Sequence, residues 1–223
     1  MGFDALSPDD IRERLETKVF GYRAFAYQSL NSTNATAKQL ARTGAQEGTL
    51  VVAEEQTAGR GRFGRYWYSP KGLGIWLSLI LRPDIDIERA PTLSLLAGLS
   101  LVEAIRGYTG LPVLLRWPND VICRGKKVCG VLTEVEPHFV ILGLGVNVNQ
   151  SSFPQELVQT ATSLYLELGR YLDRLELLSN ILLKLERNYL LFLEEGKLGR
   201  LLDSIREFSS LIGQRVIVKG LKE

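Results

Sequence analysis

The spacing of hydrophobic positions along the chain changes several times, and each spacing predicts one kind of element. Short runs rich in β-branched and aromatic residues predict strands, whereas apolar positions repeated every three or four residues predict helices. The expected strands cover residues 25–30, 49–55, 74–82, 111–116, 121–123, 127–136 and 139–148. The expected helices cover residues 7–18, 32–42, 88–108 and 173–195, and a further short helix ends near residue 208.

The longest expected helix begins and ends with clear signals. Asp173 supplies a capping oxygen, Glu176 follows in the first turn, and Gly196 stands at the far end. Leucine and aromatic residues repeat on one side of this helix at the helical spacing, so we expect them in the core. Near the start of the chain, Ser7 precedes a proline and two aspartates, which favours a second capped helix.

Composition narrows the class of protein. The chain has 223 residues, of which 45% are hydrophobic, and this suits one packed main domain with at most a small appendage. With 27 basic and 25 acidic residues the net charge is only +2, which argues against general nucleic-acid binding. The chain carries neither an apolar run of membrane-spanning length nor a signal-peptide pattern. We therefore expect a cytoplasmic protein without a nucleic-acid or membrane partner.

The two cysteines, Cys123 and Cys129, are expected to be reduced side chains on neighbouring strands. With His138 as the single histidine, they cannot complete an ordinary tetrahedral zinc site. A cysteine–histidine nucleophile pair is the other interpretation, but no residue pattern positions one.

The candidate chemistry gathers in one loop between the strands expected at residues 49–55 and 74–82. In this loop three glycines alternate with three arginines, and aromatic residues stand among them. Glycine lets a ligand approach the main chain, arginine matches phosphate and carboxylate oxygens, and an aromatic face covers a flat ring. The loop is therefore expected to fold over an anionic ligand with a flat or apolar part. Its members are Gly59, Arg60, Gly61, Arg62, Phe63, Gly64, Arg65, Tyr66 and Trp67.

Four blocks of sequence resemble the motifs of biotin protein ligases in order and spacing. They read GRGRFGRYW at residues 59–67, WPND at 117–120, KVCGVLTE at 127–134 and GLGVNVN at 143–149. The likeness covers residues 28–150, and four ordered blocks are far more specific than any one of them. The chain is similar to the monofunctional members, which have no DNA-binding winged helix before the ligase core.

The resemblance implies an α+β fold, in which a mixed, largely antiparallel sheet is backed by helices as in the catalytic core of class II aminoacyl-tRNA synthetases. Residues 1–208 would form this catalytic domain. Residues 209–223 would begin a small SH3-like β-domain, because GQRVIVK at residues 213–219 looks like its first strand. So few residues cannot complete a barrel, and the barrel is therefore expected to be truncated or absent.

The resemblance also implies a two-step reaction with ATP and biotin as substrates. The biotin carboxylate attacks the α-phosphate of ATP, which gives biotinyl-adenylate and pyrophosphate. A lysine amine of a biotin carboxyl carrier protein, a subunit of acetyl-CoA carboxylase, then attacks the activated carbonyl. Mg²⁺ is implied because triphosphate chemistry needs a hard cation on its oxygens, but no metal ligands are assigned. A homodimer is left open.

The functional positions of the family fall on specific residues of this chain. Lys127, Arg62 and Asp120 are expected to be catalytic. The biotin-binding residues that the resemblance implies are Ser32, Thr33, Asn34, Gln56, Gly59, Arg60, Gly61, Arg62, Lys127, Gly130 and Gly143. The ATP-binding residues that it implies are Arg62, Arg65, Trp67, Asn119, Asp120, Lys127 and Asn147.

Simple electrostatics supports a central role for Lys127. The first step brings two anions together, so positive charge must stand where they meet. Lys127 supplies this charge from a strand, whereas its neighbour Lys126 is expected to be an exposed lysine in the turn. A register error of one residue would exchange these two roles.

Several of these residues also have a purely structural interpretation. Ser32 and the two residues after it suit a helix N-cap, and capping by one of them is compatible with ligand contact by the others. Gly130 can be an ordinary strand glycine at a bulge. Trp67 and Trp117 are expected beside the loop or the ligand, whereas Trp76 is expected in the core.

Two other functions share part of these observations. A lipoate or octanoate ligase or transferase of the same superfamily would share the fold and the lysine, but the arginine-rich loop argues against it. A non-catalytic biotin-binding module would not need Lys127, Asn119 and Asp120 together. One departure from the family pattern is Arg116, which stands where a lysine often precedes WPND, so the charge is kept and the geometry is not.

Overall fold

The computed structural model describes residues 5–85 and 89–215. Its strands are β1 (Ala24–Tyr27), β2 (Leu50–Ala53), β3 (Gly74–Leu81), β4 (Leu114–Arg116), β5 (Asp120–Cys123), β6 (Lys126–Glu136) and β7 (Phe139–Asn147). Its helices are α1 (Pro8–Arg14), α2 (Thr33–Arg42), α3 (Ala90–Thr109), α4 (Leu164–Leu168), α5 (Arg174–Glu195) and α6 (Leu201–Phe208), with a short 3₁₀ helix η1 (Arg62–Gly64). Most of the strand expected at residues 213–219 lies outside the described residues, so the division into two domains stays a prediction.

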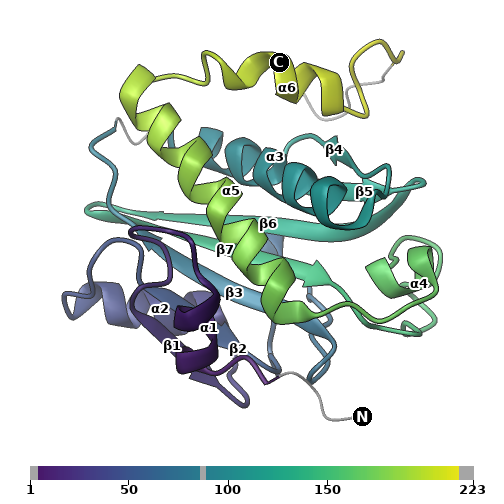
Figure 1. The fold of residues 1–223 in the computed structure, drawn as a ribbon, viewed down its shortest axis with the longest axis horizontal. Helices are drawn as coiled ribbons and strands as arrows, with labels where there is room; N and C mark the ends of the chain where they lie inside the picture. The colour runs from purple at the N-terminus through teal and green to yellow at the C-terminus, as the bar shows by residue number, and fades with distance from the viewer. Residues whose placement is uncertain (1–4, 86–88, 216–223) are drawn as a thin grey trace.

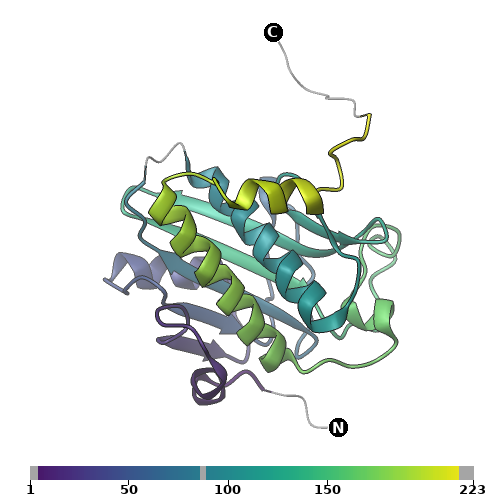
Figure 2. The same ribbon diagram turned by 45° about the horizontal axis from the view of Figure 1, so that its top comes forward.

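The described strands form a seven-stranded sheet in the order β1-β2-β3-β7-β6-β5-β4. Neighbouring strands are antiparallel except β1 and β2, which run parallel. Figures 1 and 2 show α3 and α5 lying side by side across one face of this sheet. The expected α+β fold, with a mixed and largely antiparallel sheet backed by helices, is confirmed.

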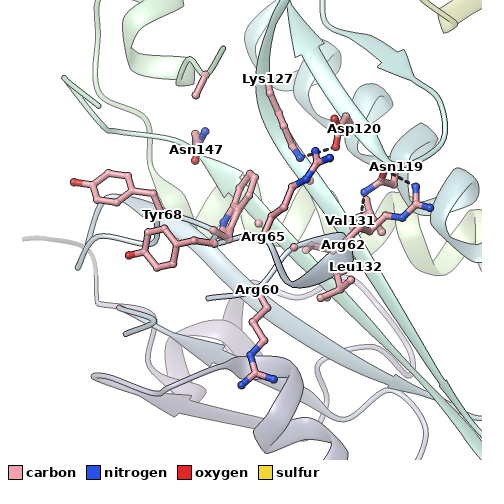
Figure 3. A pocket seen from close by; sticks show the side chains of 18 of the residues that line it. Arg60, Arg62, Arg65, Tyr68, Asn119, Asp120, Lys127, Val131, Leu132 and Asn147 are labelled. Carbon is pink, nitrogen blue, oxygen red and sulfur yellow. Dashed lines mark hydrogen bonds and ion pairs between the residues drawn. The ribbon is translucent and has the colours of Figure 1, made fainter. Parts of the chain in front are cut away.

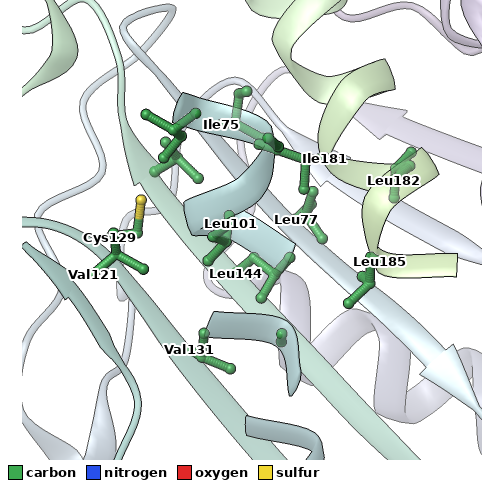
Figure 4. Packing of buried hydrophobic residues seen from close by; sticks show 14 of the residues in the cluster. Ile75, Leu77, Leu101, Val121, Cys129, Val131, Leu144, Ile181, Leu182 and Leu185 are labelled. Carbon is green, nitrogen blue, oxygen red and sulfur yellow. The ribbon is translucent and has the colours of Figure 1, made fainter. Parts of the chain in front are cut away.

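Alternation along the strands divides the apolar side chains between the two faces of the sheet. Leu77 of β3 packs in the larger core cluster with Leu101 of α3 and Ile181 of α5 (Figure 4). Ile80 of the same strand packs in a smaller cluster with Ala37 of α2. Because successive side chains of a strand point to opposite faces, α2 covers the face that α3 and α5 leave free.

The first residues of α5 and α1 follow the capping signals in the sequence. The Asp173 carboxylate caps α5 and accepts hydrogen bonds from the backbone N–H groups of Leu175 at 2.8 Å and Glu176 at 3.0 Å. The Ser7 hydroxyl caps α1 and accepts a hydrogen bond from the N–H of Asp10 at 3.1 Å. Among the described residues, the helices are too short or too polar to cross a membrane.

Helix α1 ends at Arg14, earlier than the expected residue 18, and a buried carboxylate explains why. Glu186 of α5 accepts hydrogen bonds from the three backbone N–H groups of residues 18–20, at 2.7, 2.8 and 2.8 Å. N–H groups that point at this carboxylate cannot also bond back along a helix. The partner lies far away in the sequence, so no local pattern announces it.

The other differences lie at strand ends and in one short helix. β1 ends at Tyr27, and Leu30 keeps only an isolated bridge to Gln56. β4 begins at Leu114 rather than at residue 111. The sequence pattern does not predict α4, since five residues are too few to show a helical period.

We predict that Glu186→Ala strongly destabilises the fold. The substitution leaves the buried N–H group of Phe20 and two half-buried N–H groups without an acceptor, which should lower the free energy of unfolding by about 3 kcal/mol. Urea unfolding followed by circular dichroism measures this difference. Glu194→Ala is the matched control, because Glu194 lies on the same helix with its side chain 72% exposed. Equal urea midpoints for the two variants would contradict a stabilising role for the hydrogen bonds that Glu186 accepts.

Candidate active site

A cavity of about 560 Å³ opens beside the arginine-rich loop. The loop, the start of α2, strands β5 to β7 and the segment at residues 153–161 contribute to its wall (Figure 3). Of the residues that the motifs imply for biotin and ATP, all but Gly59 line this cavity. Those that line it are Ser32, Thr33, Asn34, Gln56, Arg60, Gly61, Arg62, Arg65, Trp67, Asn119, Asp120, Lys127, Gly130, Gly143 and Asn147.

The loop is a narrow hairpin whose turn is η1. The N–H of Gly61 donates to the Arg65 carbonyl at 2.7 Å, and the N–H of Trp67 donates to the Gly59 carbonyl at 2.9 Å. Phe63 at the tip has a φ of 60° and is 82% exposed. Gly59 serves the stem, because a Cβ at this position would lie 2.5 Å from the Trp67 carbonyl oxygen.

Trp67 attaches the loop to the sheet because its indole ring packs directly against Gly145 and Gly130. A Cβ on Gly145 would stand 2.4 Å from the indole Nε1, and one on Gly130 would stand 3.1 Å from the ring. The ring also meets Trp76 edge to face, with 6.4 Å between centroids. Trp76 is fully buried, as expected, whereas Trp117 is 66% exposed and lies outside the cavity wall.

One carboxylate holds two cations at one end of the cavity. Asp120 Oδ1 lies 2.6 Å from Lys127 Nζ, and Asp120 Oδ2 accepts a hydrogen bond from Arg116 Nη2 at 2.8 Å. Lys127 Nζ also stands 4.9 Å from the centre of the Trp67 ring. Lys126 points elsewhere and donates to the Val158 carbonyl at 2.8 Å. Two cations share one anion here, which leaves this end of the cavity positive.

A β-bulge places Lys127 on the cavity face. Val121 pairs with Cys129 and Ile122 pairs with Lys127, so one residue of β6 is left over between these pairs. The extra residue brings Lys127 to the same face as Gly130, which a regular strand would not do. The backbone of Lys127 also forms a parallel bridge with Ala161, in a segment that the sequence patterns do not connect with the site.

The three loop arginines differ in their contacts. Arg62 Nη1 donates to Asn119 Oδ1 at 3.3 Å, and Asn119 Nδ2 in turn donates to the Val131 carbonyl at 2.8 Å. The side chains of Arg60 and Arg65 form no hydrogen bond or ion pair with any described residue. Figure 3 shows Arg60 extending away from Lys127 and Asp120. All three guanidinium groups are exposed and available to an anionic ligand.

The part of the cavity wall at the start of α2 is formed by uncharged polar side chains. Ser32 caps α2, as expected, by accepting from the N–H of Ala35 at 3.5 Å. Gln56 Oε1 lies 2.9 Å from the backbone N of Thr33 and 3.1 Å from its hydroxyl, while Gln56 Nε2 donates to Ser69 Oγ at 3.0 Å. These groups are buried and form a fixed set of donors and acceptors.

Asn147 is more constrained than the motif suggests. Its Nδ2 donates to the Thr162 carbonyl at 3.0 Å, and its Oδ1 accepts from Gln150 Nε2 at 3.2 Å. Both polar ends of the side chain are thus already bonded within the protein. Phe153 and Leu157, which no motif indicates, stand in the same wall and supply apolar surface.

The cysteines take no part in this chemistry. Cys123 and Cys129 are buried free thiols on the neighbouring strands β5 and β6, as expected. Burial raises the pKa of Cys123 to about 11 and raises the pKa of Cys129 still further. Both thiols therefore stay protonated near neutral pH, which removes them as nucleophiles.

The fold and the cavity define a class of protein, and comparison with known sequences identifies its family. The model of the biotin/lipoate A/B protein ligase family matches residues 26–147, and the chain belongs to this family. The bifunctional ligase/repressor BirA of Bacillus subtilis is 44% identical over 198 residues, which are 86% of this chain and 61% of that protein. The chain thus spans about three fifths of the length of this relative.

Two further comparisons cover a larger share of both chains than the match to BirA. The biotin–[acetyl-CoA-carboxylase] ligase of Mycobacterium tuberculosis is 37% identical over 221 residues, which are 96% of this chain and 81% of that protein. The structure of biotin protein ligase from Aquifex aeolicus in complex with biotin and ATP superposes with a TM-score of 0.80 at 35% identity. It covers 89% of this chain and 84% of that one. The fold is thus that of the biotin protein ligases, with their class II synthetase-like core.

We predict that Gly145→Ala destabilises the protein by displacing Trp67. The added methyl group meets the indole at a distance that no real side chain tolerates, so the ring must shift at a cost of about 1–2 kcal/mol. Gly107→Ala is the matched control, because nothing lies within 4 Å of its added Cβ in α3. Alanine should stabilise that helix by up to about 1 kcal/mol. Urea unfolding that shows a gain at both positions would contradict this packing.

Proposed function

We propose that the chain activates biotin with ATP to biotinyl-5'-adenylate and transfers the biotin to one lysine of a biotin carboxyl carrier protein. The observation that carries this proposal is a cavity with two chemically different ends. A set of neutral donors and acceptors at the start of α2 suits the ureido ring, and the cluster at Lys127 suits the carboxylate and the phosphates. The names of the relatives from Mycobacterium tuberculosis and Aquifex aeolicus support the same substrates.

In the first step, a biotin carboxylate oxygen forms a bond to the α-phosphorus of ATP. The bond between the α-phosphorus and the bridging oxygen breaks, and pyrophosphate leaves. Lys127 reduces the repulsion between the two anions because its charge stands where they meet, and Arg62 and Arg65 bring further positive charge from the loop. Asp120 holds Lys127 in place until the ligands compete for its charge.

In the second step, the amine of the carrier lysine attacks the acyl carbon of the adenylate. The bond between this carbon and the phosphate oxygen breaks, AMP leaves, and the amine loses a proton. We assign Asp120 to orient the amine, since it is the acidic side chain among the described residues of the cavity wall. No covalent enzyme intermediate is part of this proposal.

Mg²⁺ enters this proposal as the metal complex of ATP. The described residues contain no group of three or more histidine, cysteine or carboxylate side chains that could hold a metal ion. Asp120 is already shared by two cations, so it offers a metal little free charge. These residues do not fit a metal held by the protein, and no catalytic step is assigned to one.

The experiment that tests the function is ATP–pyrophosphate exchange with biotin, lipoate and octanoate in parallel. Exchange should depend on biotin and should stay near background with the two other acids. A preference for lipoate or octanoate would favour the rival activity of the same family. Tight biotin binding without exchange would instead indicate a non-catalytic binding module.

We predict that Lys127→Ala slows adenylate formation by about 10²-fold, the scale of one strong electrostatic contact in a transition state. Biotin affinity should change much less, because this charge acts chiefly where the two anions meet. Lys126→Ala is the matched control and should keep its rate, since Lys126 bonds to Val158 outside the cavity. Rapid-quench measurement compares the rates of adenylate formation of the two variants. If only Lys126→Ala slowed adenylate formation, the catalytic role would belong to Lys126 and its assignment to Lys127 would be wrong.

We also predict that ligands order the loop. Its three arginines repel one another and its glycines carry backbone entropy, so closure should be coupled to the binding of phosphate. Trypsin should cut the free protein after Arg60, Arg62 or Arg65, and biotin with a non-hydrolysable ATP analogue should slow this cut. Cleavage after Arg170, which is exposed outside the cavity wall, is the internal control. Equal rates with and without ligands would mean a preformed anion site.

A further inference from the structure

Trp117 belongs to the WPND block, yet neither step of the proposed reaction gives it a role. It begins the turn at residues 117–119 between β4 and β5, and it is 66% exposed. Its neighbours Arg116 and Pro118 line the cavity, whereas Trp117 does not. The indole ring therefore stands at the rim of the cavity, outside the space that biotin and ATP would fill.

The turn that carries Trp117 is held on both sides. Arg116 pairs with Asp120 across the turn, and Arg116 Nη2 lies 2.8 Å from Asp120 Oδ2. Asn119 is bonded twice to Val131 of β6, because its Nδ2 donates to the Val131 carbonyl at 2.8 Å and its own carbonyl accepts the Val131 N–H at 2.9 Å. A side chain on a turn that is already fixed loses little backbone freedom when a partner covers it, which favours binding.

The tip of the arginine-rich loop reaches the same turn. Arg62 Nη1 donates to Asn119 Oδ1 at 3.3 Å, a contact that Figure 3 shows. The guanidinium carbon of Arg62 also lies 5.0 Å from the centre of the Phe63 ring, and Phe63 is 82% exposed. Tryptophan and arginine are enriched among the residues that contribute most to the affinity of protein interfaces. The rim at this turn thus has the composition of a protein-binding surface.

The second step of the proposed reaction brings a protein to this rim. The amine of the carrier lysine must reach the adenylate beside Asp120, so the carrier backbone can stand back from Asp120 by no more than one lysine side chain. Residues 118 and 119 are all that separate Trp117 from Asp120 along the chain. A carrier domain that inserts its lysine at Asp120 therefore comes to lie over the rim. The exposed guanidinium groups of the loop favour acidic side chains on the carrier around that lysine.

We propose that Trp117 is a docking residue for the carrier protein, which packs an apolar side chain next to its acceptor lysine against the indole ring. This inference rests on the proposed function, because the carrier is the substrate of the second step. Trp117 then contributes to recognition of the carrier and takes no part in either chemical step. Covering an indole removes a large apolar area from water, so a single residue can supply much of the affinity.

The test follows the transfer of biotin from preformed biotinyl-adenylate to the apo carrier subunit of the acetyl-CoA carboxylase from the same organism. In Trp117→Ala, the carrier concentration that gives half-maximal transfer should rise about tenfold or more, the scale of losing one dominant interface residue. The rate at saturating carrier should stay within about twofold of the wild-type rate, because the lost contact is not specific to the transition state. Trp117→Phe should recover part of the loss, since a phenyl ring still packs against the carrier.

Two controls separate docking from damage to the site. Hydroxylamine attacks the same acyl carbon and releases AMP and biotin hydroxamate, but it is too small to need the rim, so Trp117→Ala should react with it at the wild-type rate. Tyr22→Ala is the matched control variant, because Tyr22 is 73% exposed, lies outside the cavity wall and precedes β1, at the opposite edge of the sheet from β4. Tyr22→Ala should leave transfer to the carrier unchanged.

A fluorescence measurement detects the contact in the wild-type protein itself. Trp76 is buried and Trp67 is half-buried, so acrylamide should quench chiefly the emission of Trp117 in the free protein. Adding the apo carrier subunit together with a non-reactive analogue of biotinyl-adenylate should reduce this quenching, after the signal of the carrier alone is subtracted. The reduction should be absent in Trp117→Phe, which lacks this indole.

The outcomes separate this inference from the function on which it rests. If Trp117→Ala is saturated by the carrier at the wild-type concentration, or if it weakens ATP binding instead, the inference is overturned while the proposed function stands. An equal loss of the hydroxylamine reaction and of transfer to the carrier overturns it as well, because the ring would then support the site and not the partner. If the wild-type protein forms no biotinyl-adenylate, the proposed function itself fails.

Discussion

The cavity depends on the carboxylate of Asp120, which keeps Lys127 and Arg116 together. Two cations at one end of a half-enclosed site repel each other, and a shared anion removes most of that cost. Arg116 and Asp120 face each other across the turn between β4 and β5, so the carboxylate is delivered by the sheet itself. The loop arginines need no such partner, because they lie in solvent until an anion arrives. The paired cations on the sheet and the exposed arginines of the loop are thus two parts of one charge arrangement.

The site also requires strand positions without side chains on the face of the sheet below the cavity. Gly130, Gly143 and Gly145 lie where β6 and β7 pass under the cavity. A Cβ would clash with Asn34 at Gly143 and with Trp67 at Gly145, and it would make a tight contact with Lys127 at Gly130. These positions give up apolar packing on that face. The opposite face compensates, because α3 and α5 cover it with a continuous cluster of buried aliphatic residues (Figure 4). One face of the sheet therefore stabilises the fold, and the other holds the ligand site.

The cationic side chains near Lys127 and the uncharged side chains near Thr33 affect ligand binding in different ways. Near Lys127 the wall attracts anions without much regard to their shape. Around Thr33 the groups are buried, and buried polar groups that lack partners are costly, so this end is selective. Affinity and selectivity can therefore be altered by different residues.

The sequence alone determined the elements with strong local signals and the kinds of chemistry present. The capped helices, the hairpin of β5 and β6, the buried cysteines and Trp76 follow from neighbours within one or two turns of chain, and the ordered motifs identify the family. Tertiary structure decided the rest. The bulge beside Lys127, the early end of α1 at Glu186, the exposure of Trp117 and the wall segment at residues 153–161 depend on distant partners. Asn34 and Glu134 are 100 residues apart, and no local period can reveal that they touch. Folding alone brings such groups within hydrogen-bond distance.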